Sequence, residues 1–344
     1  MLNYVILCYN ITMIKVGVIR GGISSGYELS LKTGSNVLSH LRSEKLNKTY
    51  KAIDVLIDKE GIWHINGKPI SIPDVFHSVD VIFNALHGDY GEDGKVQQIL
   101  DGWKIPYTGS GAFASALGYN KVLAKEQFAL LGIKTPSHIV VPKYRKEDGP
   151  IKSYSKNVAQ QIHSQLPPPW ITKPLSGGSS VGMRMCKTYP NLINAFLDGV
   201  NKEVDVLVEE MIEGKEATVG VINNFRNKKV YILPSTEIRV HKGKDFFDFE
   251  AKYEGMSEEI CPGNFTRKEK DELERLAELI HIGLNLSHYS RSDFIIHPRK
   301  GIYALEVNTL PGLTDESLIP KMLKAVGADV PSFIDHLIKL ALKK

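Results

Sequence analysis

The chain has 344 residues, of which 42% are hydrophobic and 24% charged, so it can bury a proper core and is long enough for about two or three domains. Its net charge of +4 is small for this length, and no basic block with interleaved aromatic residues occurs, which argues against nucleic-acid binding. The three cysteines form no metal-binding spacing, no apolar run is long enough to span a membrane, and the N-terminus lacks the features of a signal peptide. We therefore expect a cytoplasmic protein with no nucleic-acid or membrane partner.

Residues 14–108 alternate short apolar strands with helical segments, which is typical of a parallel α/β sheet. We predict strands at 15–19, 51–57 and 79–84 and a helix at 28–41. Residues 1–12 precede the first strand and are predicted to be an N-terminal extension.

A glycine-rich loop that contains one histidine follows the strand at 79–84. Ligands of open α/β sheets bind at the carboxyl ends of the strands, so His87 is a candidate for contacting a substrate carboxylate. For Glu92 and Asp93, capping of the next helix is the favoured interpretation, because acids suit a helix N-terminus.

A loop rich in glycine and serine runs from Lys173 to Met183, after a strand predicted at 170–173. Glycines let backbone N–H groups approach phosphate oxygens, and serine hydroxyls add donors. The loop is not a Walker A motif, because the residue order differs and no matching helix follows. It is therefore either a phosphate-binding segment or a flexible hairpin loop, and the pattern alone favours neither.

A buried strand that ends in acidic residues covers about 206–210 and leads through a glycine turn to Glu216. Backbone groups near Met211 and Ile212 could pair with an adenine edge, and Glu216 could accept hydrogen bonds from ribose hydroxyls. Acids at a strand end are more often simply solvated, so both interpretations stay open at this point.

An aromatic segment at 246–253 precedes a charged amphipathic helix predicted at 266–284. Its aromatic side chains suit a core strand, but Lys252 and Tyr253 at its end could also face a cleft.

The most informative stretch is a predicted β-hairpin, in which two apolar runs flank a Pro/Gly turn. If residues 298–301 form the turn, His297 pairs with Ile302, and Asp293 lies opposite Glu306. Directly opposed residues have Cβ atoms only ~5 Å apart. Two carboxylates that close repel each other unless a cation lies between them.

The same register places Arg291 opposite Asn308, on the face that carries the two carboxylates, because side chains alternate along strands. Carboxylate and amide oxygens are the hard ligands that Mg²⁺ takes alongside water and substrate phosphates. Asp293, Glu306 and Asn308 are therefore candidate metal ligands. The alternative is a solvated hairpin in which the acids occur by chance.

The loop after the hairpin, at 308–317, could present backbone N–H groups and Ser317 beside that metal site, and a last helix is predicted at 331–342. Each motif alone is a modest signal. Together the lysines at 173 and 252, the Gly/Ser loop, the segment at 206–216 that could hold adenosine, and the hairpin indicate an ATP site.

The order and spacing of these motifs from about Lys15 onward resemble the ATP-grasp superfamily, and within it the D-alanine–D-alanine ligases. The hairpin and the Gly/Ser loop would suit many ATP-grasp enzymes. The pieces that narrow the resemblance are Gly21-Gly22 with Glu28-Leu29-Ser30, His87-Gly88 with Gly91-Glu92-Asp93-Gly94, and Glu250-Ala251-Lys252-Tyr253.

The resemblance implies a ligase in which ATP phosphorylates the carboxylate of one D-alanine and the amino group of a second attacks the acyl phosphate. The products would be D-alanyl-D-alanine for peptidoglycan synthesis, ADP and phosphate.

The resemblance also assigns roles to matching residues. The amino-acid substrates would be held by Glu28, His87, Ser317 and the Leu318 N–H. Ser179 and Tyr253 would form a hydrogen-bonded trio with Glu28, while Arg291 and the Gly312 N–H would stabilise the tetrahedral intermediate. ATP would be bound by Lys121, Lys173, Ser179, Ser180, Glu209, Glu210, Met211, Ile212, Glu216 and Lys252. Two Mg²⁺ ions, or Mn²⁺ in their place, would be held by Asp293, Glu306 and Asn308.

The implied architecture is a mixed α/β ATP-grasp fold, with an N-terminal parallel α/β domain and two α+β subdomains that clamp ATP. We predict limits at 13–120, 121–220 and 221–344, and closing lids at 175–182 and 238–262. A homodimer is implied by the resemblance alone.

Other functions remain as hypotheses. A related ligase could use D-lactate or D-serine as its second substrate, although Tyr253 favours an amine nucleophile, since family members that make the D-lactate ester can carry Phe there. A nucleotide-binding regulatory protein with a decayed site would be expected to lack a metal ligand or Lys173, and none is missing. A dinucleotide-dependent oxidoreductase is disfavoured because Gly21 to Gly26 does not match G-x-G-x-x-G.

Overall fold

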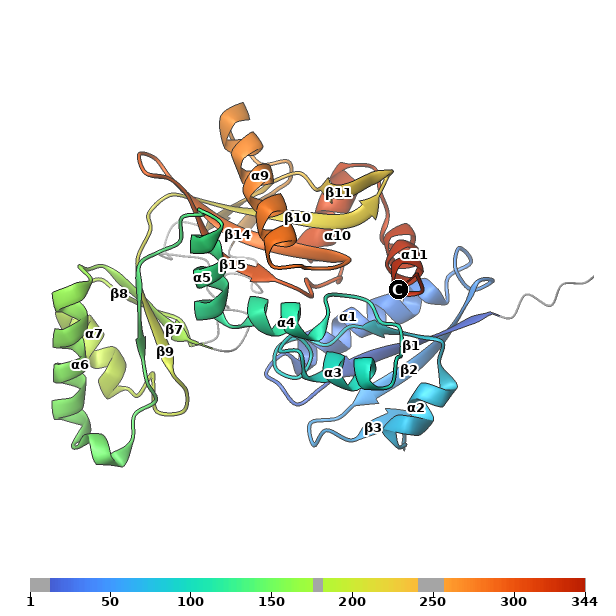
Figure 1. Cartoon of the computed structure of the whole chain (residues 1–344), viewed down its shortest axis with the longest axis horizontal. Helices are drawn as coiled ribbons and strands as arrows, with labels where there is room; N and C mark the ends of the chain where they lie inside the picture. Colours follow the sequence, from blue (N-terminus) through green and yellow to red (C-terminus); the bar gives the residue numbers. More distant parts are fainter. Residues whose placement is uncertain (1–12, 176–181, 241–256, 344) are drawn as a thin grey trace, which may run out of the picture.

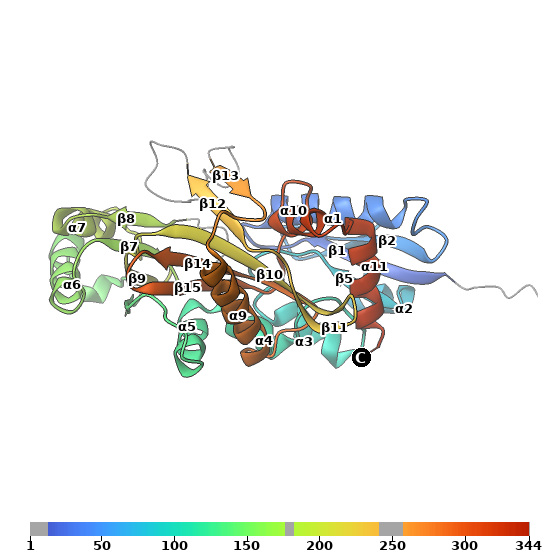
Figure 2. The same ribbon diagram turned by 90° about the horizontal axis from the view of Figure 1, so that it is seen from above.

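The computed structural model describes residues 13–175, 182–240 and 257–343. Figure 1 shows an N-terminal lobe in blue, a second lobe in green that stands apart from it, and a C-terminal body in orange and red that contacts both. Seen from above, the molecule is elongated, with the C-terminal body between the two lobes (Figure 2). No helix within these residues combines the length and apolar composition needed to cross a bilayer.

The N-terminal lobe is built on a sheet whose described strands follow the order β4-β3-β2-β1-β5. β1 pairs in parallel with β2 and β5, which confirms the predicted parallel arrangement, whereas β3 and β4 add an antiparallel edge. All four residues of β5 are buried, as expected for a central strand covered on both faces. The elements are β1 (Ile14–Gly21), α1 (Tyr27–Leu41), β2 (Tyr50–Ile57), β3 (Trp63–Ile65), β4 (Lys68–Pro69), α2 (Ile72–Ser78), β5 (Val81–Asn84), α3 (Lys95–Gly102) and α4 (Ala112–Tyr119).

The green lobe contains a sheet of order β6-β9-β7-β8 over the described residues, with α6 and α7 against it (Figure 1). Its core gathers around Trp170 and Phe196, which are fully buried. The elements are β6 (His138–Val141), a 3₁₀ turn (Lys146–Asp148), α6 (Ile151–Gln165), β7 (Trp170–Pro174), β8 (Arg184–Cys186), α7 (Tyr189–Leu197) and β9 (Val206–Glu210).

The C-terminal body has a sheet whose described strands follow the order β13-β12-β10-β14-β15, with β11 paired to β10. Helix α5 (Lys121–Leu130) packs into the core of this body through Phe128, alongside helix α9. The other elements are β10 (Lys215–Phe225), β11 (Lys228–Ile232), β12 (Thr236–Val240), β13 (Ser257–Ile260), α9 (Arg267–Gly283), β14 (Tyr289–His297), β15 (Gly301–Asn308), α10 (Leu318–Ala325) and α11 (Val330–Ala341).

One hydrophobic core joins the N-terminal lobe to the C-terminal helices. It contains Val16 and Val37 from the first lobe together with Leu313, Ile319 and Phe333. The loop between β15 and α10 therefore packs directly against α1, which brings two predicted substrate-binding segments together.

Local sequence signals fix where several helices begin. Thr188 and Thr266 each accept a hydrogen bond from the backbone N–H three residues on, in capping boxes that start α7 and α9. Asp329 accepts from the Ser332 N–H at the start of α11. The predicted helices at 28–41, 266–284 and 331–342 are confirmed to within about two residues at each end.

Several predictions lie outside the described residues. They are the extension at 1–12, most of both lids, and the side chains of Ser179, Ser180, Lys252 and Tyr253. The domain limits at 120 and 220 stay a prediction.

Candidate functional site

The hairpin of β14 and β15 places its acidic residues opposite each other. Asp293 pairs with Glu306 and Arg291 pairs with Asn308. The predicted pairing of His297 with Ile302 is wrong, because the turn is one residue tighter and His297 pairs with Gly301. A β-bulge between Asp293 and Phe294 offsets this difference, since Leu305 is the extra residue on β15.

The carboxylate of Asp293 already accepts hydrogen bonds from three side chains. Arg291 Nε donates to Oδ1 and Arg291 Nη2 to Oδ2, each at 2.9 Å. Thr218 Oγ1, on the neighbouring strand β10, donates to Oδ1 at 2.6 Å, and Asn308 Nδ2 donates to Oδ2 at 3.3 Å. The guanidinium of Arg291 therefore forms an ion pair with this carboxylate.

The donor chemistry of this face fits a magnesium site. Among the described residues, no three His, Cys, Asp or Glu side chains are arranged to hold a metal ion. The predicted ligands Asp293, Glu306 and Asn308 supply two carboxylates and one amide oxygen. Phosphate and water would fill the remaining coordination positions, as is usual for Mg²⁺.

Three ionisable side chains form a buried cluster where α5, β7 and β9 meet. Glu209 is 3% exposed, and its two oxygens lie 2.7 Å from Lys125 Nζ and 2.8 Å from Lys173 Nζ. Burial alone would raise the pKa of Glu209, but the two ammonium groups outweigh burial and lower the pKa to about 2. The alternative of a solvated strand end is therefore wrong for Glu209.

Lys121 and Lys173 interact electrostatically with Glu306 of the hairpin. Burial tends to lower the pKa of Lys173, but Glu209 and Glu306 outweigh burial and raise it. Burial lowers the pKa of Lys121, while Glu306, Glu209 and Glu92 oppose that change and Lys173 adds to it. Lys121, at the start of α5, thus lies near charged groups from all three parts of the molecule.

The segment after β9 is held in place by backbone contacts. Glu210 Oε1 accepts from the Ser137 N–H at 2.9 Å, and the Met211 N–H donates to the Pro169 carbonyl at 3.0 Å. The contact of backbone groups near Met211 and Ile212 with an adenine edge stays a prediction. Glu216 is the second residue of β10 and pairs with Ile238 and Ile295.

In the N-terminal lobe, His87 lies between a side chain of α1 and one of its own loop. Its Nε2 lies 2.9 Å from Thr33 Oγ1 on α1, and its Nδ1 lies 3.4 Å from Glu92 Oε1. The expectation that Glu92 caps the next helix is wrong, because Gly94 is the N-cap of α3 and Glu92 turns toward His87.

The loop that holds His87 packs closely against the start of α1. A Cβ on Gly26 would lie 2.6 Å from the His87 carbonyl oxygen, so only glycine fits there. Ser24 Oγ donates to the same oxygen at 2.6 Å. Glu28, an exposed side chain in the first turn of α1, is thereby held near the His87 loop.

Gly312 and Ser317 face each other in the loop before α10. A Cβ on Gly312 would lie 2.8 Å from Ser317 Oγ. Ser317 is the N-cap residue of α10, and its Oγ lies 2.7 Å from Thr314 Oγ1 rather than capping the helix. The first N–H groups of α10, including that of Leu318, suit a carboxylate.

Sequence reasoning missed Lys125 and Thr218. Lys125 lies one helical turn after Lys121 on α5, and this spacing is the only signal that could have pointed to it. Thr218 carries no sequence signal, because its role depends on β10 pairing with β14.

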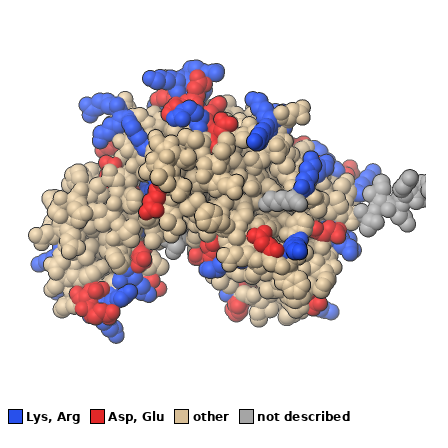
Figure 3. Space-filling model, viewed as in Figure 1, with Lys and Arg blue, Asp and Glu red and all other residues tan. Residues whose placement is uncertain are grey.

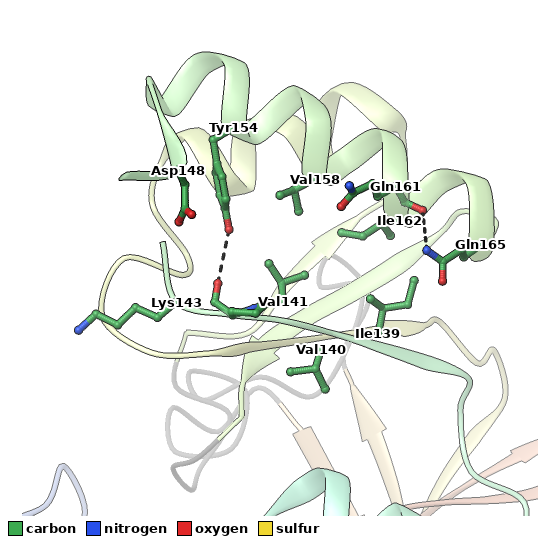
Figure 4. Close-up of a pocket in the computed structure, with 11 residues that line it drawn as sticks. Ile139, Val140, Val141, Lys143, Asp148, Tyr154, Val158, Gln161, Ile162 and Gln165 are labelled. Atoms are coloured by element: carbon green, nitrogen blue, oxygen red, sulfur yellow. Dashed lines mark hydrogen bonds between the residues drawn. The ribbon is translucent and has the colours of Figure 1, made fainter. Parts of the chain in front are cut away.

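A separate groove lies in the green lobe between α6 and β6, lined by Ile139, Val141, Tyr154 and Ile162 among others (Figure 4). Tyr154 Oη donates to the Pro142 carbonyl at 3.4 Å across one end of it. None of the predicted site residues lines this groove. On the face in Figure 3, a notch separates this lobe from the N-terminal lobe, and charges of both signs gather over α9.

Known proteins resemble this chain over most of its length. The family described as "D-ala D-ala ligase N-terminus" matches residues 65–110, and "D-ala D-ala ligase C-terminus" matches residues 128–339. A D-alanine–D-alanine ligase of Geobacillus kaustophilus is 33% identical, covering 96% of this chain and 95% of its own. One from Geobacter sulfurreducens is 35% identical, covering 94% and 93%.

Two solved structures align with nearly the whole chain. The VanG D-Ala:D-Ser ligase of Enterococcus faecalis aligns with a TM-score of 0.80 and 27% identity, over 96% of this chain and 100% of its own. The D-alanyl-alanine synthetase A of Vibrio cholerae aligns with a TM-score of 0.80 and 26% identity, over 97% and 99%.

The fold is thus the ATP-grasp fold of a ligase, a class of enzyme that uses ATP. Within that class the chain belongs to the D-alanine–D-alanine ligase family.

Proposed function

We propose that this chain joins two D-alanine molecules into D-alanyl-D-alanine for peptidoglycan synthesis, through a D-alanyl phosphate, with release of ADP and phosphate. The observation that carries the proposal is the convergence of Lys121, Lys173 and Glu306, from three elements far apart in sequence, into one charged site. Membership of the family supplies the amino-acid substrates.

The first chemical step brings two anions together, because the carboxylate of D-alanine attacks the γ-phosphoryl group of ATP. Catalysis of such a step depends mainly on positioning and on positive charge. Lys121 and Lys173 would supply that charge, with Lys252, Ser179 and Ser180 as further contacts to the phosphates. The segment from Glu209 to Ile212, with Glu216, would hold adenine and ribose.

The second step is attack of an amino group on the acyl phosphate. Glu28 would bind the ammonium of the first D-alanine, and His87 would lie beside its carboxylate. Ser317 and the Leu318 N–H would hold the carboxylate of the second D-alanine at the start of α10. Arg291 and the Gly312 N–H would stabilise the oxyanion of the tetrahedral intermediate, and Ser179 and Tyr253 would order the site around Glu28.

Two Mg²⁺ ions would be held by Asp293, Glu306 and Asn308, with Mn²⁺ as a substitute. Bound there, they would neutralise charge on the phosphates of ATP. We also propose a cytoplasmic homodimer, in which each subunit follows the domain limits predicted from the sequence.

A phosphate-release assay tests the proposal. The protein is incubated with ATP, Mg²⁺ and, in separate reactions, D-alanine, L-alanine, D-serine or D-lactate, and phosphate is measured together with product mass. We expect phosphate release that depends on D-alanine and a product with the mass of the dipeptide. No D-alanine-dependent release with either Mg²⁺ or Mn²⁺ would contradict the proposal.

Mixtures of D-alanine with D-serine or D-lactate test the alternative. Preferential formation of the mixed product would move the assignment to a related ligase with a different second substrate.

A further inference from the structure

Lys125 is a fully buried lysine that the proposed chemistry does not use. It lies on α5, with 0% of its surface exposed. Its ammonium group lies 2.7 Å from Glu209 Oε1 and donates to Thr135 Oγ1 at 2.7 Å. A buried ammonium is costly unless it is paired, so this position is specified by its partners.

Glu209 connects Lys125 to a lysine that is predicted to contact ATP. Its second oxygen lies 2.8 Å from Lys173 Nζ. One negative charge is therefore shared between two ammonium groups, and the cluster keeps a single net positive charge. Lys173 in turn faces the charge of Glu306 on the hairpin.

We infer that Lys125 is a positioning residue for nucleotide phosphate: by sharing Glu209, it leaves Lys173 with charge and N–H donors for the phosphates. This inference rests on the proposed function, because it takes Lys173 as a phosphate ligand. Without Lys125, Glu209 would neutralise Lys173 completely, and the cluster would have no net charge to offer an anion.

The electrostatics of Lys125 agree with this role. Burial is the largest influence and lowers the pKa of Lys125 to about 8, against the opposing effect of Glu209. The charged groups that face it are Glu209 on β9, Lys173 on β7 and Glu306 on β15. Its charge is therefore present at neutral pH and is lost as the pH rises through about 8.

Binding of ADP, measured by calorimetry without metal or D-alanine, tests the inference. We expect Lys125→Met to weaken ADP binding roughly tenfold, the size expected when one charge near a phosphate is lost. Lys152→Met, an exposed lysine on α6, is the control for general loss of positive charge.

The outcomes separate the inference from the proposed function. Failure of the wild-type chain to bind ADP would contradict the proposed function. Equal binding by the wild type and Lys125→Met would overturn only the role of Lys125.

The variant Lys125→Arg gives a second test that does not depend on a buried methionine. A guanidinium stays charged at every accessible pH. We expect ADP binding to weaken more in the wild type than in Lys125→Arg between about pH 7 and about pH 9, as Lys125 loses its proton. Any contribution from Lys121, whose pKa is also lowered by burial, is common to both proteins. Parallel weakening in both proteins would overturn the inference.

Steady-state kinetics add a readout that a purely structural role would not give. We expect Lys125→Met to raise the KM for ATP, while the KM for D-alanine stays close to that of the wild type. Equal rises in both constants would indicate general damage to the site and would overturn the inference.

Discussion

At the scale of single residues, two groups have surroundings that leave them little freedom. Gly312 is one of them, because any side chain there meets Ser317 Oγ. His281 is another, since it is 1% exposed and only its Nδ1 has a hydrogen-bond partner, Ser290 Oγ, among the described residues. The two residues give different predictions, one about catalysis and one about stability.

The substitution Gly312→Ala should impair the reaction without unfolding the protein. Its backbone conformation is open to alanine, but the new Cβ would lie 2.8 Å from Ser317 Oγ and would displace the groups proposed to hold the second D-alanine. We expect kcat/KM for D-alanine to fall roughly tenfold or more, since small misplacements at a reacting centre are costly. Gly102→Ala, where a Cβ meets nothing within 4 Å, is the control. Similar kinetics for the two variants would contradict the role of the Gly312 loop.

The stability of the protein should fall in mild acid because of His281. Burial lowers the pKa of His281 to about 4 from an ordinary value of 6.5, so the unfolded chain binds the proton more readily than the folded one. Stability is then lost as the pH falls from 6.5 toward 4, by about 2 kcal/mol between about pH 7.5 and about pH 5. Urea unfolding at both pH values measures this loss.

In His281→Gln the part of the acid effect due to this residue should disappear. In the exposed control His77→Gln it should remain. An unchanged pH dependence in His281→Gln would contradict this assignment.

At the scale of elements, helix α5 carries both Lys121 and Lys125 into the site. The helix starts at Asn120, whose Oδ1 accepts from the N–H groups of Val122 and Leu123 at 3.0 and 3.2 Å. The direction of the first turn, and hence of Lys121, depends on this cap.

The substitution Asn120→Ala should therefore affect both stability and nucleotide binding. Loss of an N-cap costs about 1 kcal/mol. We expect urea unfolding to show that loss and the KM for ATP to rise. The control is Thr188→Ala, which removes the cap of α7 and should lower stability by a similar amount with an unchanged KM for ATP. Equal effects of both variants on KM would count against a role for the α5 cap.

The elements also show what the sequence could and could not predict. The apolar runs and the Pro/Gly turn identified the hairpin. Its pairing of Asp293 with Glu306 matches the prediction only because the bulge at Leu305 offsets a turn that is one residue tighter than predicted. The bulge at Leu305 escaped prediction, since bulges depend on local fit between paired strands. The cluster of Lys125, Glu209 and Lys173 escaped because it needs three elements to meet in space.

At the scale of the whole molecule, the N-terminal lobe and the C-terminal body are joined closely beside the proposed substrate site. Asn36 Nδ2 on α1 donates to the Leu313 carbonyl at 2.6 Å. A Cβ on Gly118 would lie 2.8 Å from Thr309 Cγ2, which shows how tightly α4 packs on the loop after β15. We call these contacts between α1, α4 and the loop after β15 the lobe interface. They fix the position of Glu28, which lies on the same helix as Asn36, relative to Gly312.

Asn36→Ala tests whether the lobe interface affects the reaction. The substitution removes the partner of a carbonyl in a partly buried loop, which costs about 1 kcal/mol. We expect the KM for D-alanine to rise more than the KM for ATP, because the lobe interface positions the residues proposed to bind D-alanine and not those proposed to bind ATP. The exposed Asn47→Ala serves as the control, and a larger effect of Asn36→Ala on ATP than on D-alanine would argue against this arrangement.

The most direct test of the central claim is to follow an oxygen atom of the substrate. D-Alanine with isotopically labelled carboxylate oxygens is incubated with the protein, ATP and Mg²⁺, and the released phosphate is analysed by mass spectrometry. If the carboxylate attacks the γ-phosphoryl group and the acyl phosphate is then displaced by an amine, each phosphate carries one labelled oxygen. Unlabelled phosphate formed together with the dipeptide would contradict the account.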